Sequence, residues 1–335
     1  MKKLINDPFD FVEESLEGFV LAHEHLIKRV GKRVVARVDA PIQGKVGVVI
    51  GGGSGHLPAF MGYVGPGGAD AAPIGNIFAS PPAKPVLEAT LAANGGAGVV
   101  YSYGNYAGDV MNFDRAAARA AEQGIQVETV LVTDDVASAP KDEGHRRRGI
   151  AGDFFVFKVL AAKAETMADL ASVVATTRRA NDYARTVGVG LSPCTVPAHG
   201  TPTFHLADDE LELGLGVHGE PGIRRSAIEP ADKLVDEILG LILADKDYTD
   251  SDVAILVNGL GATPYEELYV MYRRARRVLA GHGVTVRRSY VGEYVTSLEM
   301  AGASITLMQL DEELHDLLAA PAQCPMFVQM GGAHG

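Results

Sequence analysis

Short apolar segments typical of β-strands alternate along this chain with segments typical of α-helices. Residues 46–50 lead directly into a glycine-rich loop, and residues 98–102 and 127–132 are each followed by a polar stretch. Between the last two lies an alanine-rich segment, 114–123, with the composition of a helix. This order of strand, loop, helix and strand predicts an α/β fold, in which ligands bind at the carboxyl ends of the strands.

A second alternating pattern begins after about residue 187, following two predicted helices at 154–164 and 167–186. Its elements are helices at 230–243 and 266–279 and strands at 253–257, 284–290 and 304–309. We therefore predict two α/β domains, an N-terminal one over 1–187 and a C-terminal one over 188–335, each a central sheet flanked by helices. Ligand sites are common between domains, and we expect the site at this interface.

The charge of the chain excludes some classes of partner. The formal net charge is −12 over 335 residues, which argues against nucleic acid or an anionic membrane as the main partner. The one dense basic run, Arg146–Arg148, is interpreted either as a solvated loop or as a patch that meets a negatively charged partner. No stretch of about 18 apolar residues occurs, so no transmembrane helix is expected.

The two cysteines, Cys194 and Cys324, are too few for a disulfide framework and lack the spacing of metal ligands. A cytoplasmic location is the expectation that follows. The acidic pair Asp134-Asp135 follows a predicted strand without further clustered carboxylates, and we interpret it as a turn. We therefore predict no metal site on this chain.

Two histidines are set among glycines, far apart in the sequence. His56 ends the run Gly51-Gly-Gly-Ser-Gly-His, and His218 lies within Gly214-Leu-Gly-Val-His-Gly-Glu-Pro-Gly222. Glycine lacks side-chain bulk and allows backbone angles that other residues avoid, so a small molecule can approach such an imidazole closely. Each run alone is equally consistent with a tight turn. Together they indicate one site assembled from two parts of the fold.

Further candidate residues surround these histidines. The first loop lacks the lysine of a phosphate-binding P-loop, and Pro58 interrupts the helix that a dinucleotide-binding fingerprint requires. Backbone amides at Gly53 and Gly55 and the hydroxyl of Ser54 can instead bind a hydroxylated ligand. Asp109 follows a predicted strand and can orient an imidazole or accept a proton, although a helix cap is an equally simple interpretation.

Taken together, these motifs resemble the substrate-binding subunit of the dihydroxyacetone kinase family. The matching runs keep the family's order over most of the chain; they are Gly51–His56, Asn105–Asp109, Cys194–Pro197, Gly216–Gly222 and Asn258–Pro264. The run around His218 is highly specific, whereas the Gly51 loop alone is not.

The resemblance implies a role for each site residue. The histidine that matches His218 attacks the ketone carbon and forms a covalent hemiaminal, which selects carbonyl compounds over polyols such as glycerol. The residues that match His56 and Asp109 bind the ketose and assist removal of the hydroxyl proton. Gly53, Ser54 and Gly55 are expected to contact the substrate. A covalent tether makes positioning intramolecular, which is worth several kcal/mol of barrier.

The resemblance also implies partners. In the family, the nucleotide and its magnesium ions lie on a separate, mostly helical domain or subunit, so ATP or ADP with Mg is expected on a partner subunit and no cofactor on this chain. The phosphoryl donor is either ATP or a phosphoenolpyruvate-dependent phosphotransferase relay. A homodimer of this subunit is also expected.

Two positions depart from the family pattern. Leu57 stands where many members carry glutamate, and Gly104 stands where many carry a lysine close to the triose. Losing that lysine opens space, so a four-carbon ketose such as erythrulose is an alternative substrate to dihydroxyacetone. Two other functions remain open: a non-catalytic ketose sensor that docks on a regulator, and an unrelated isomerase or aldolase that uses the same histidines.

Overall fold

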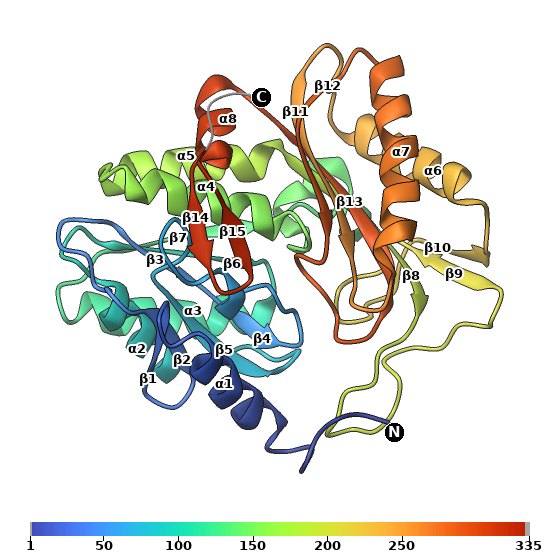
Figure 1. Ribbon diagram of the computed structural model, residues 1–335. Coiled ribbons are helices and arrows are strands. Elements are labelled where there is room, and N and C mark those ends of the chain that lie inside the picture. Colours follow the sequence, from blue (N-terminus) through green and yellow to red (C-terminus); the bar gives the residue numbers. More distant parts are fainter. Residues whose placement is uncertain (1, 332–335) are drawn as a thin grey trace. The chain divides into compact units, whose positions relative to one another are not determined.

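The computed structural model describes residues 2–331, and its contacts divide the chain into two compact units (Figure 1). The first unit comprises Met1–Leu131, Val156–Arg179 and Asp316–Gly335, and the second comprises Val132–Phe155 and Ala180–His315. Each unit has its own sheet with helices packed against it, which confirms the predicted α/β class. The two units interleave along the sequence, whereas the predicted domains, 1–187 and 188–335, are each continuous.

The first unit is built on a seven-stranded mixed sheet of order β1-β2-β5-β3-β6-β7, with β4 paired to β5. Its strands are β1 (Ile27–Val30), β2 (Val34–Arg37), β3 (Gly47–Ile50), β4 (Gly52–Ser54), β5 (Ala71–Ile77), β6 (Val99–Gly104) and β7 (Val127–Val132). Its helices are α1 (Phe11–Ala22), α2 (Ala83–Ala93), α3 (Ala107–Ala121), α4 (Asp153–Glu165) and α5 (Leu170–Tyr183). Figure 1 shows α2 and α3 on one side of this sheet and α4 and α5 on the other.

The core of the first unit forms where small helix residues meet branched strand residues. Alanines on one face of α2 and α3, such as Ala89 and Ala116, pack against Val49 and Val99 of the sheet. Small side chains allow the helices to approach closely, and burial of the β-branched residues supplies about 1.5–3 kcal/mol for each side chain. The hairpin of β14 (Ala322–Cys324) and β15 (Phe327–Gln329) completes the unit near the end of the chain.

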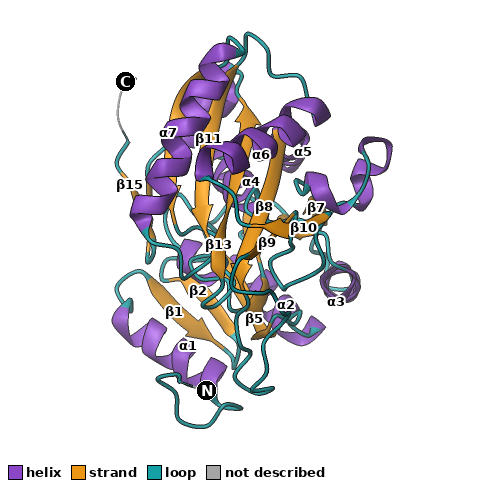
Figure 2. Cartoon of the chain, turned by 90° about the vertical axis from the view of Figure 1, so that its right-hand side faces the viewer, coloured by secondary structure: helices purple, strands orange, loops and turns teal. Residues whose placement is uncertain are grey.

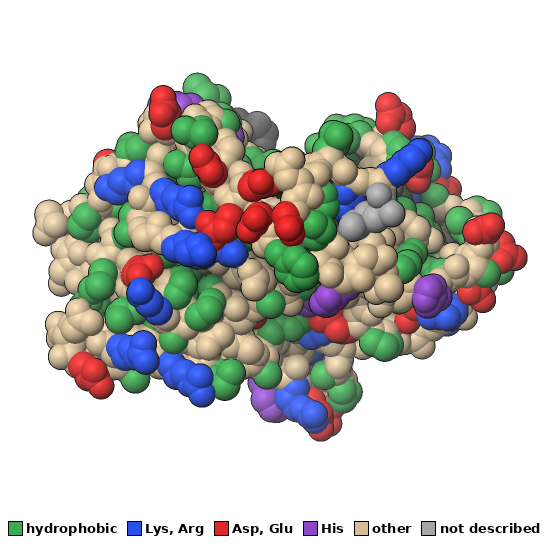
Figure 3. All heavy atoms as spheres, turned by 90° about the horizontal axis from the view of Figure 1, so that it is seen from below, with side chains coloured by type: hydrophobic (Ala, Val, Ile, Leu, Met, Phe, Trp, Pro, Cys, Tyr) green, Lys and Arg blue, Asp and Glu red, His purple; other side chains and the backbone are tan. Residues whose placement is uncertain are grey.

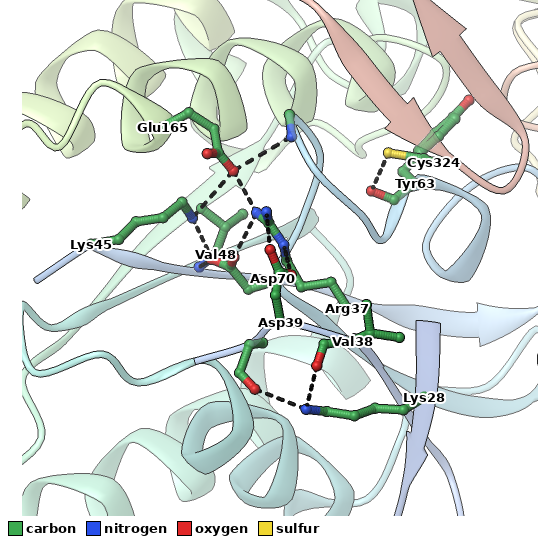
Figure 4. A network of polar contacts seen from close by, with 12 residues as sticks. Lys28, Arg37, Val38, Asp39, Lys45, Val48, Tyr63, Asp70, Glu165 and Cys324 are labelled. Carbon is green, nitrogen blue, oxygen red and sulfur yellow. Dashed lines mark hydrogen bonds and ion pairs between the residues drawn. The ribbon is translucent and has the colours of Figure 1, made fainter. Parts of the chain in front are cut away.

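A buried ionic network links the sheet of the first unit to the end of α4 (Figure 4). The Nζ of Lys45 lies 2.6 Å from Oδ2 of Asp70, and both side chains are almost fully buried. Arg37 on β2 reaches Asp70 as well as Glu165 at the end of α4. Because buried charges are costly unless they are paired, these residues stabilise one arrangement of β2, β5 and α4.

The second unit has a six-stranded sheet of order β10-β9-β8-β13-β11-β12. The strands are β8 (Ala184–Ser192), β9 (Glu210–Leu213), β10 (Arg224–Ala227), β11 (Asp252–Gly259), β12 (Thr285–Gly292) and β13 (Ala301–Gln309). Figure 2 shows α6 (Ala231–Asp245) and α7 (Tyr265–Gly281) against one face of it. The core residues Ile238, Leu268 and Ile255 are fully buried between these layers. Helix α8 (Glu312–Ala319) follows β13 in the chain.

Several predicted boundaries were wrong. Helix α3 begins at Ala107 rather than near 114, and α5 ends at Tyr183 because Ala184 starts β8. Strands β5, β8, β9 and β10 and helix α2 are among the elements that were not predicted.

Within residues 2–331, no helix combines the length and apolar character needed to cross a bilayer. On the face shown in Figure 3, Lys and Arg side chains lie in several separate places with Asp and Glu among them.

Candidate active site

The loops that carry His56 and Asp109 leave the first sheet at the same edge. Strands β3 and β6 are parallel neighbours, with Ile50 opposite Ser102. Strand β5 also runs parallel to β3. Because the carboxyl ends of parallel strands meet at one edge, the segments that follow β3, β5 and β6 gather there. The glycine loop after β3 and the polar stretch after β6 therefore leave the sheet at the same edge.

The glycines after β3 are required by packing. A Cβ on Gly51 would lie 2.8 Å from Pro73, and one on Gly52 would lie 2.5 Å from the Phe60 ring. A Cβ on Gly53 would lie 2.6 Å from the backbone nitrogen of Ala79. Each distance is too short for any other residue type. The backbone at Gly51–Gly53 is therefore packed too closely by its neighbours to carry side chains.

Ser54 serves this local structure through its hydroxyl, which donates to the carbonyl of Gly75 at 2.7 Å. Its backbone carbonyl accepts from the nitrogen of Phe78 at 3.0 Å. The backbone of Gly55 has a φ of 104°, a conformation that favours glycine. The loop that leads to His56 is thus fixed by contacts to β5 and the segment after it.

Two phenylalanines hold the imidazole of His56. The ring stacks on Phe78 at a centroid distance of 5.0 Å and meets Phe60 edge-on at 6.3 Å. Both phenylalanines have positive φ, 68° for Phe60 and 54° for Phe78. Non-glycine residues rarely adopt this conformation, and such strain concentrates at functional sites. His56 itself is only 4% exposed. Its placement is therefore over-determined by its neighbours.

Asp109 lies in the first turn of α3, where its negative charge is favoured by the partial positive charge of the helix N-terminus. It is half-buried, and on the same helix Asn112 donates to the hydroxyl of Ser80 at 3.2 Å. The segment after β5 thus contacts both the ring of His56, through Phe78, and the start of α3. The sequence analysis did not predict a role for this segment, because it contains no recognisable catalytic or binding motif.

His218 belongs to the second unit, at the turn of the hairpin formed by β9 and β10. Leu213 pairs with Arg224 where the strands end, and the nitrogen of Ile223 donates to the carbonyl of Leu213 at 2.8 Å. Gly214 has a φ of 78°, and its nitrogen donates to Gly188 on β8 at 2.7 Å. The histidine therefore stands on a hairpin that is anchored to the sheet.

The carboxylate of Glu220 orients His218. One oxygen, Oε1, lies 2.8 Å from the imidazole Nδ1, and the other accepts from the backbone nitrogen of His218 at 3.0 Å. A carboxylate accepts hydrogen bonds, so the neutral imidazole carries its proton on Nδ1 and its lone pair on Nε2. The side chain of His218 is 24% exposed.

The pKa of Glu220 records this interaction. Burial alone would raise it, but the hydrogen bond from His218 and the nearby guanidinium of Arg148 outweigh burial and lower the pKa to about 2. Glu220 is therefore ionised across the working pH range. The matched family run contains this residue, yet sequence reasoning gave it no role.

The basic run is mostly buried. Arg147 is 2% exposed and donates to both carboxylate oxygens of Asp245 at 2.8 and 2.6 Å. Arg148 pairs with Asp135 at 2.9 Å. Arg146 alone is well exposed, and it pairs locally with Glu143. The interpretation of this run as a solvated loop was therefore wrong, because ion pairing offsets the cost of burying two guanidinium groups.

The remaining polar candidates have structural surroundings. Asp134 is buried and accepts from the nitrogens of Ile150 and Gly152 at 2.8 and 2.7 Å, so it makes long-range structural contacts rather than forming the turn that was predicted. Cys194 is buried, and burial raises the pKa of its thiol. Over residues 2–331, no group of three or more His, Cys, Asp or Glu side chains is arranged to hold a metal ion.

Comparison with known proteins gives this geometry a family. Residues 17–326 match the Dak1 domain. The dihydroxyacetone-binding subunit DhaK of the PTS-dependent dihydroxyacetone kinase 2 of Listeria innocua is 46% identical, over 98% of this chain and 99% of that protein. The chain belongs to the dihydroxyacetone kinase family.

Other members differ in length and in their named activity. The D-erythrulose kinase of Mycolicibacterium smegmatis is 47% identical over 98% of this chain, which spans 56% of that protein. The solved dihydroxyacetone kinase of C. freundii, in complex with AMP-PNP and Mg²⁺, superposes with a TM-score of 0.88 at 30% identity; it covers 98% of this chain, which spans 61% of it. A solved dihydroxyacetone kinase operon co-activator, Dha-DhaQ, gives a TM-score of 0.88 at 31% identity, over 95% of this chain and 98% of that one.

Proposed function

We propose that this chain is the substrate-binding subunit of a dihydroxyacetone-type kinase, which captures a small ketose so that one of its hydroxyl groups can be phosphorylated. The observation that carries the proposal is the pairing of His218 with Glu220 at the turn of the β9–β10 hairpin. This pairing places the lone pair on Nε2, and a nitrogen lone pair is what attacks the carbon of a ketone. Family membership supports the substrate class.

Capture forms a hemiaminal. The Nε2 lone pair of His218 attacks the ketone carbon, and the carbonyl π electrons move to the oxygen. The imidazole gives up its Nδ1 proton to Glu220, the new alkoxide oxygen takes a proton from water, and Glu220 returns its proton to the resulting hydroxide, so atoms and charge balance. Glycerol has no carbonyl carbon and cannot undergo this step. The reaction therefore selects ketoses over polyols of equal size.

His56 and Asp109 assist phosphoryl transfer. As the substrate oxygen bonds to phosphorus, its O–H bond breaks and one of these groups accepts the proton, while the donor's P–O bond breaks. A positioned general base of this kind contributes roughly 10²–10⁴-fold to the rate. The backbone of Gly53–Gly55 and Ser54 would contact the ketose where side chains cannot enter.

The phosphoryl donor is proposed to reside on a partner subunit that binds ATP, or ADP recharged by a phosphotransferase relay, with magnesium. The chain spans only about half of the erythrulose kinase, which leaves a second region of that protein to carry other functions. The relative from Listeria is named as PTS-dependent, which favours the relay. A homodimer and a cytoplasmic location remain part of this proposal.

The ketose has three or four carbons. Dihydroxyacetone and D-erythrulose are named for relatives of almost equal identity to this chain, 46% and 47%. Gly104, the last residue of β6, is buried and offers no cationic side chain to a triose. Dihydroxyacetone stays the first candidate and erythrulose the second.

The test is a calorimetric titration of the purified chain with dihydroxyacetone, D-erythrulose, L-erythrulose and glycerol. The proposal expects binding of at least one ketose, no binding of glycerol, and loss of ketose binding in His218→Ala with an unchanged melting temperature. Equal binding of glycerol, or a His218→Ala variant that binds ketose like wild type, would refute the hemiaminal.

The Dha-DhaQ co-activator keeps a second candidate open, a ketose sensor without kinase activity. Adding a nucleotide-binding partner subunit to the ketose-loaded chain separates the two. Formation of a phosphorylated ketose supports the kinase subunit. Tight ketose binding with no product from any nucleotide or phosphotransferase donor supports the sensor.

A further inference from the structure

Arg148 connects the His218 turn to the sheet of the second unit. Its Nε donates to Oδ2 of Asp135 at 2.9 Å, and the carboxylate of Asp135 is fully buried. The backbone of Asp135 forms an isolated bridge with Thr186 on β8. In addition, the backbone nitrogen of Arg148 donates to the hydroxyl of Ser138 at 3.0 Å. Arg148 is therefore fixed both at its backbone nitrogen and at its Nε.

The guanidinium then spans the histidine turn. Its Nη2 donates to the carbonyl of Gly214 at 3.4 Å, and its Nη1 lies 4.0 Å from Oε2 of Glu220. Oε2 is the oxygen that accepts from the backbone of His218. The positive charge of Arg148 thus faces Oε2 of Glu220, whereas the imidazole of His218 contacts Oε1.

Gly216 makes this contact possible. A Cβ at this position would lie 2.2 Å from Oε2 of Glu220 and 2.7 Å from Nη1 of Arg148. No positive φ accompanies Gly216, so the missing side chain, rather than the backbone conformation, is what leaves room for these two groups. The carboxylate of Glu220 and the guanidinium of Arg148 lie beside Gly216, where a side chain would separate them.

We propose that Arg148 is a positioning residue, which acts through Glu220 to hold the imidazole of His218 with its proton on Nδ1 and its lone pair on Nε2. The catalytic meaning of this role rests on the proposed ketose capture. The orientation of the imidazole does not, and it is measurable without substrate. One arginine of the basic run thereby acquires a function in place of a partner-facing patch.

The experiment compares Arg148→Met with wild type in two measurements. The first is ¹⁵N NMR of the histidine side chains in the ketose-free chain, which reports the tautomer of His218. The second is the ketose dissociation constant, with the adduct followed by ¹³C NMR of a ketone-labelled substrate. Arg148→Met is expected to mix the tautomers and to weaken ketose capture about tenfold, a typical coupling between neighbouring groups.

A double-mutant cycle with Glu220→Gln tests whether Arg148 acts through Glu220. If it does, Arg148→Met adds less than about twofold to the loss in the Glu220→Gln background. Equal losses in both backgrounds would overturn the proposal, as would an unchanged tautomer and affinity in Arg148→Met. Arg146→Met is the matched control, because Arg146 is exposed, and it should change neither measurement.

Removing Arg148 leaves the buried Asp135 without its cation, so that variant can fail to fold. Gly216→Ala provides the second route, because it displaces Glu220 from Arg148 while retaining every charge. It is expected to weaken ketose capture about as much. If wild type forms no adduct but Arg148→Met or Gly216→Ala still changes the tautomer of His218, the proposed function fails and the positioning role stands. If Gly216→Ala retains the wild-type tautomer and affinity, the positioning role fails.

Discussion

Glu220→Gln provides the sharpest test of the interaction at the hairpin turn. The carboxylate accepts from two donors of His218, the imidazole Nδ1 and the backbone nitrogen. Its pKa is lowered from 4.5 to about 2, even though burial opposes the change. At about 1.4 kcal/mol per pKa unit, this fall corresponds to about 3 kcal/mol of preference for the ionised form in the folded state. The side chain is 29% exposed, and screening by solvent reduces the expected value to about 2 kcal/mol.

The sign follows from linkage. A carboxyl group whose pKa is lower in the folded state stabilises the fold above the unfolded pKa, near 4.5, and this contribution is lost as the pH falls toward 2. At pH 5, Glu220→Gln should therefore reduce the free energy of unfolding by about 2 kcal/mol. The difference from wild type should shrink steadily between pH 4.5 and pH 3.

Urea unfolding of both proteins at pH 5, 4 and 3 measures this difference directly. Glu143→Gln is the control, because Glu143 pairs with Arg146 on the surface and should cost less than about 0.5 kcal/mol at every pH. A Glu220→Gln variant that matches wild type at pH 5, or a difference that stays constant down to pH 3, would refute the assignment of Glu220 as the ionised partner of His218.

Three further predictions concern other residues. Asp109→Asn should retain ketose binding within about threefold but reduce phosphoryl transfer by roughly 10²-fold or more in a coupled assay with the partner subunit, and equal losses in both would assign Asp109 to binding alone. Lys45→Met leaves the buried Asp70 with one cation fewer and should lower the free energy of unfolding by about 3 kcal/mol in urea titrations, while a similar change at the exposed Lys84 should have little effect. Gly104→Lys should shift the ratio of dissociation constants from erythrulose toward dihydroxyacetone, and an unchanged ratio would remove this position from substrate selection.

The α/β class and the edge of the first sheet were predictable because they depend on local patterns. Apolar runs that end in Gly51 or near Asn105 indicate strands followed by loops, and parallel strands place such loops at one edge. The histidines stood out for a similar reason, since a glycine-flanked imidazole is a feature of the sequence itself. Those signals survive without any knowledge of tertiary contacts.

The boundaries of the units were not predictable in the same way. Residues 132–155 contact the second unit and residues 156–179 the first, although they are adjacent in the chain. Which unit a segment joins depends on the partners that bury its apolar face. A sequence pattern reports that such a face exists but does not name the partner.

The sequence by itself determined which groups are candidates for the proposed ketose site: the imidazoles of His56 and His218, the carboxylate of Asp109, and the glycines that flank the two histidines. Only the tertiary structure decided what holds those groups in place. Phe78 stacks on His56 from a loop more than twenty residues away, and Arg148 faces Glu220 across more than seventy residues of chain. Such contacts follow from strand order and packing, which bring together residues that no local pattern connects.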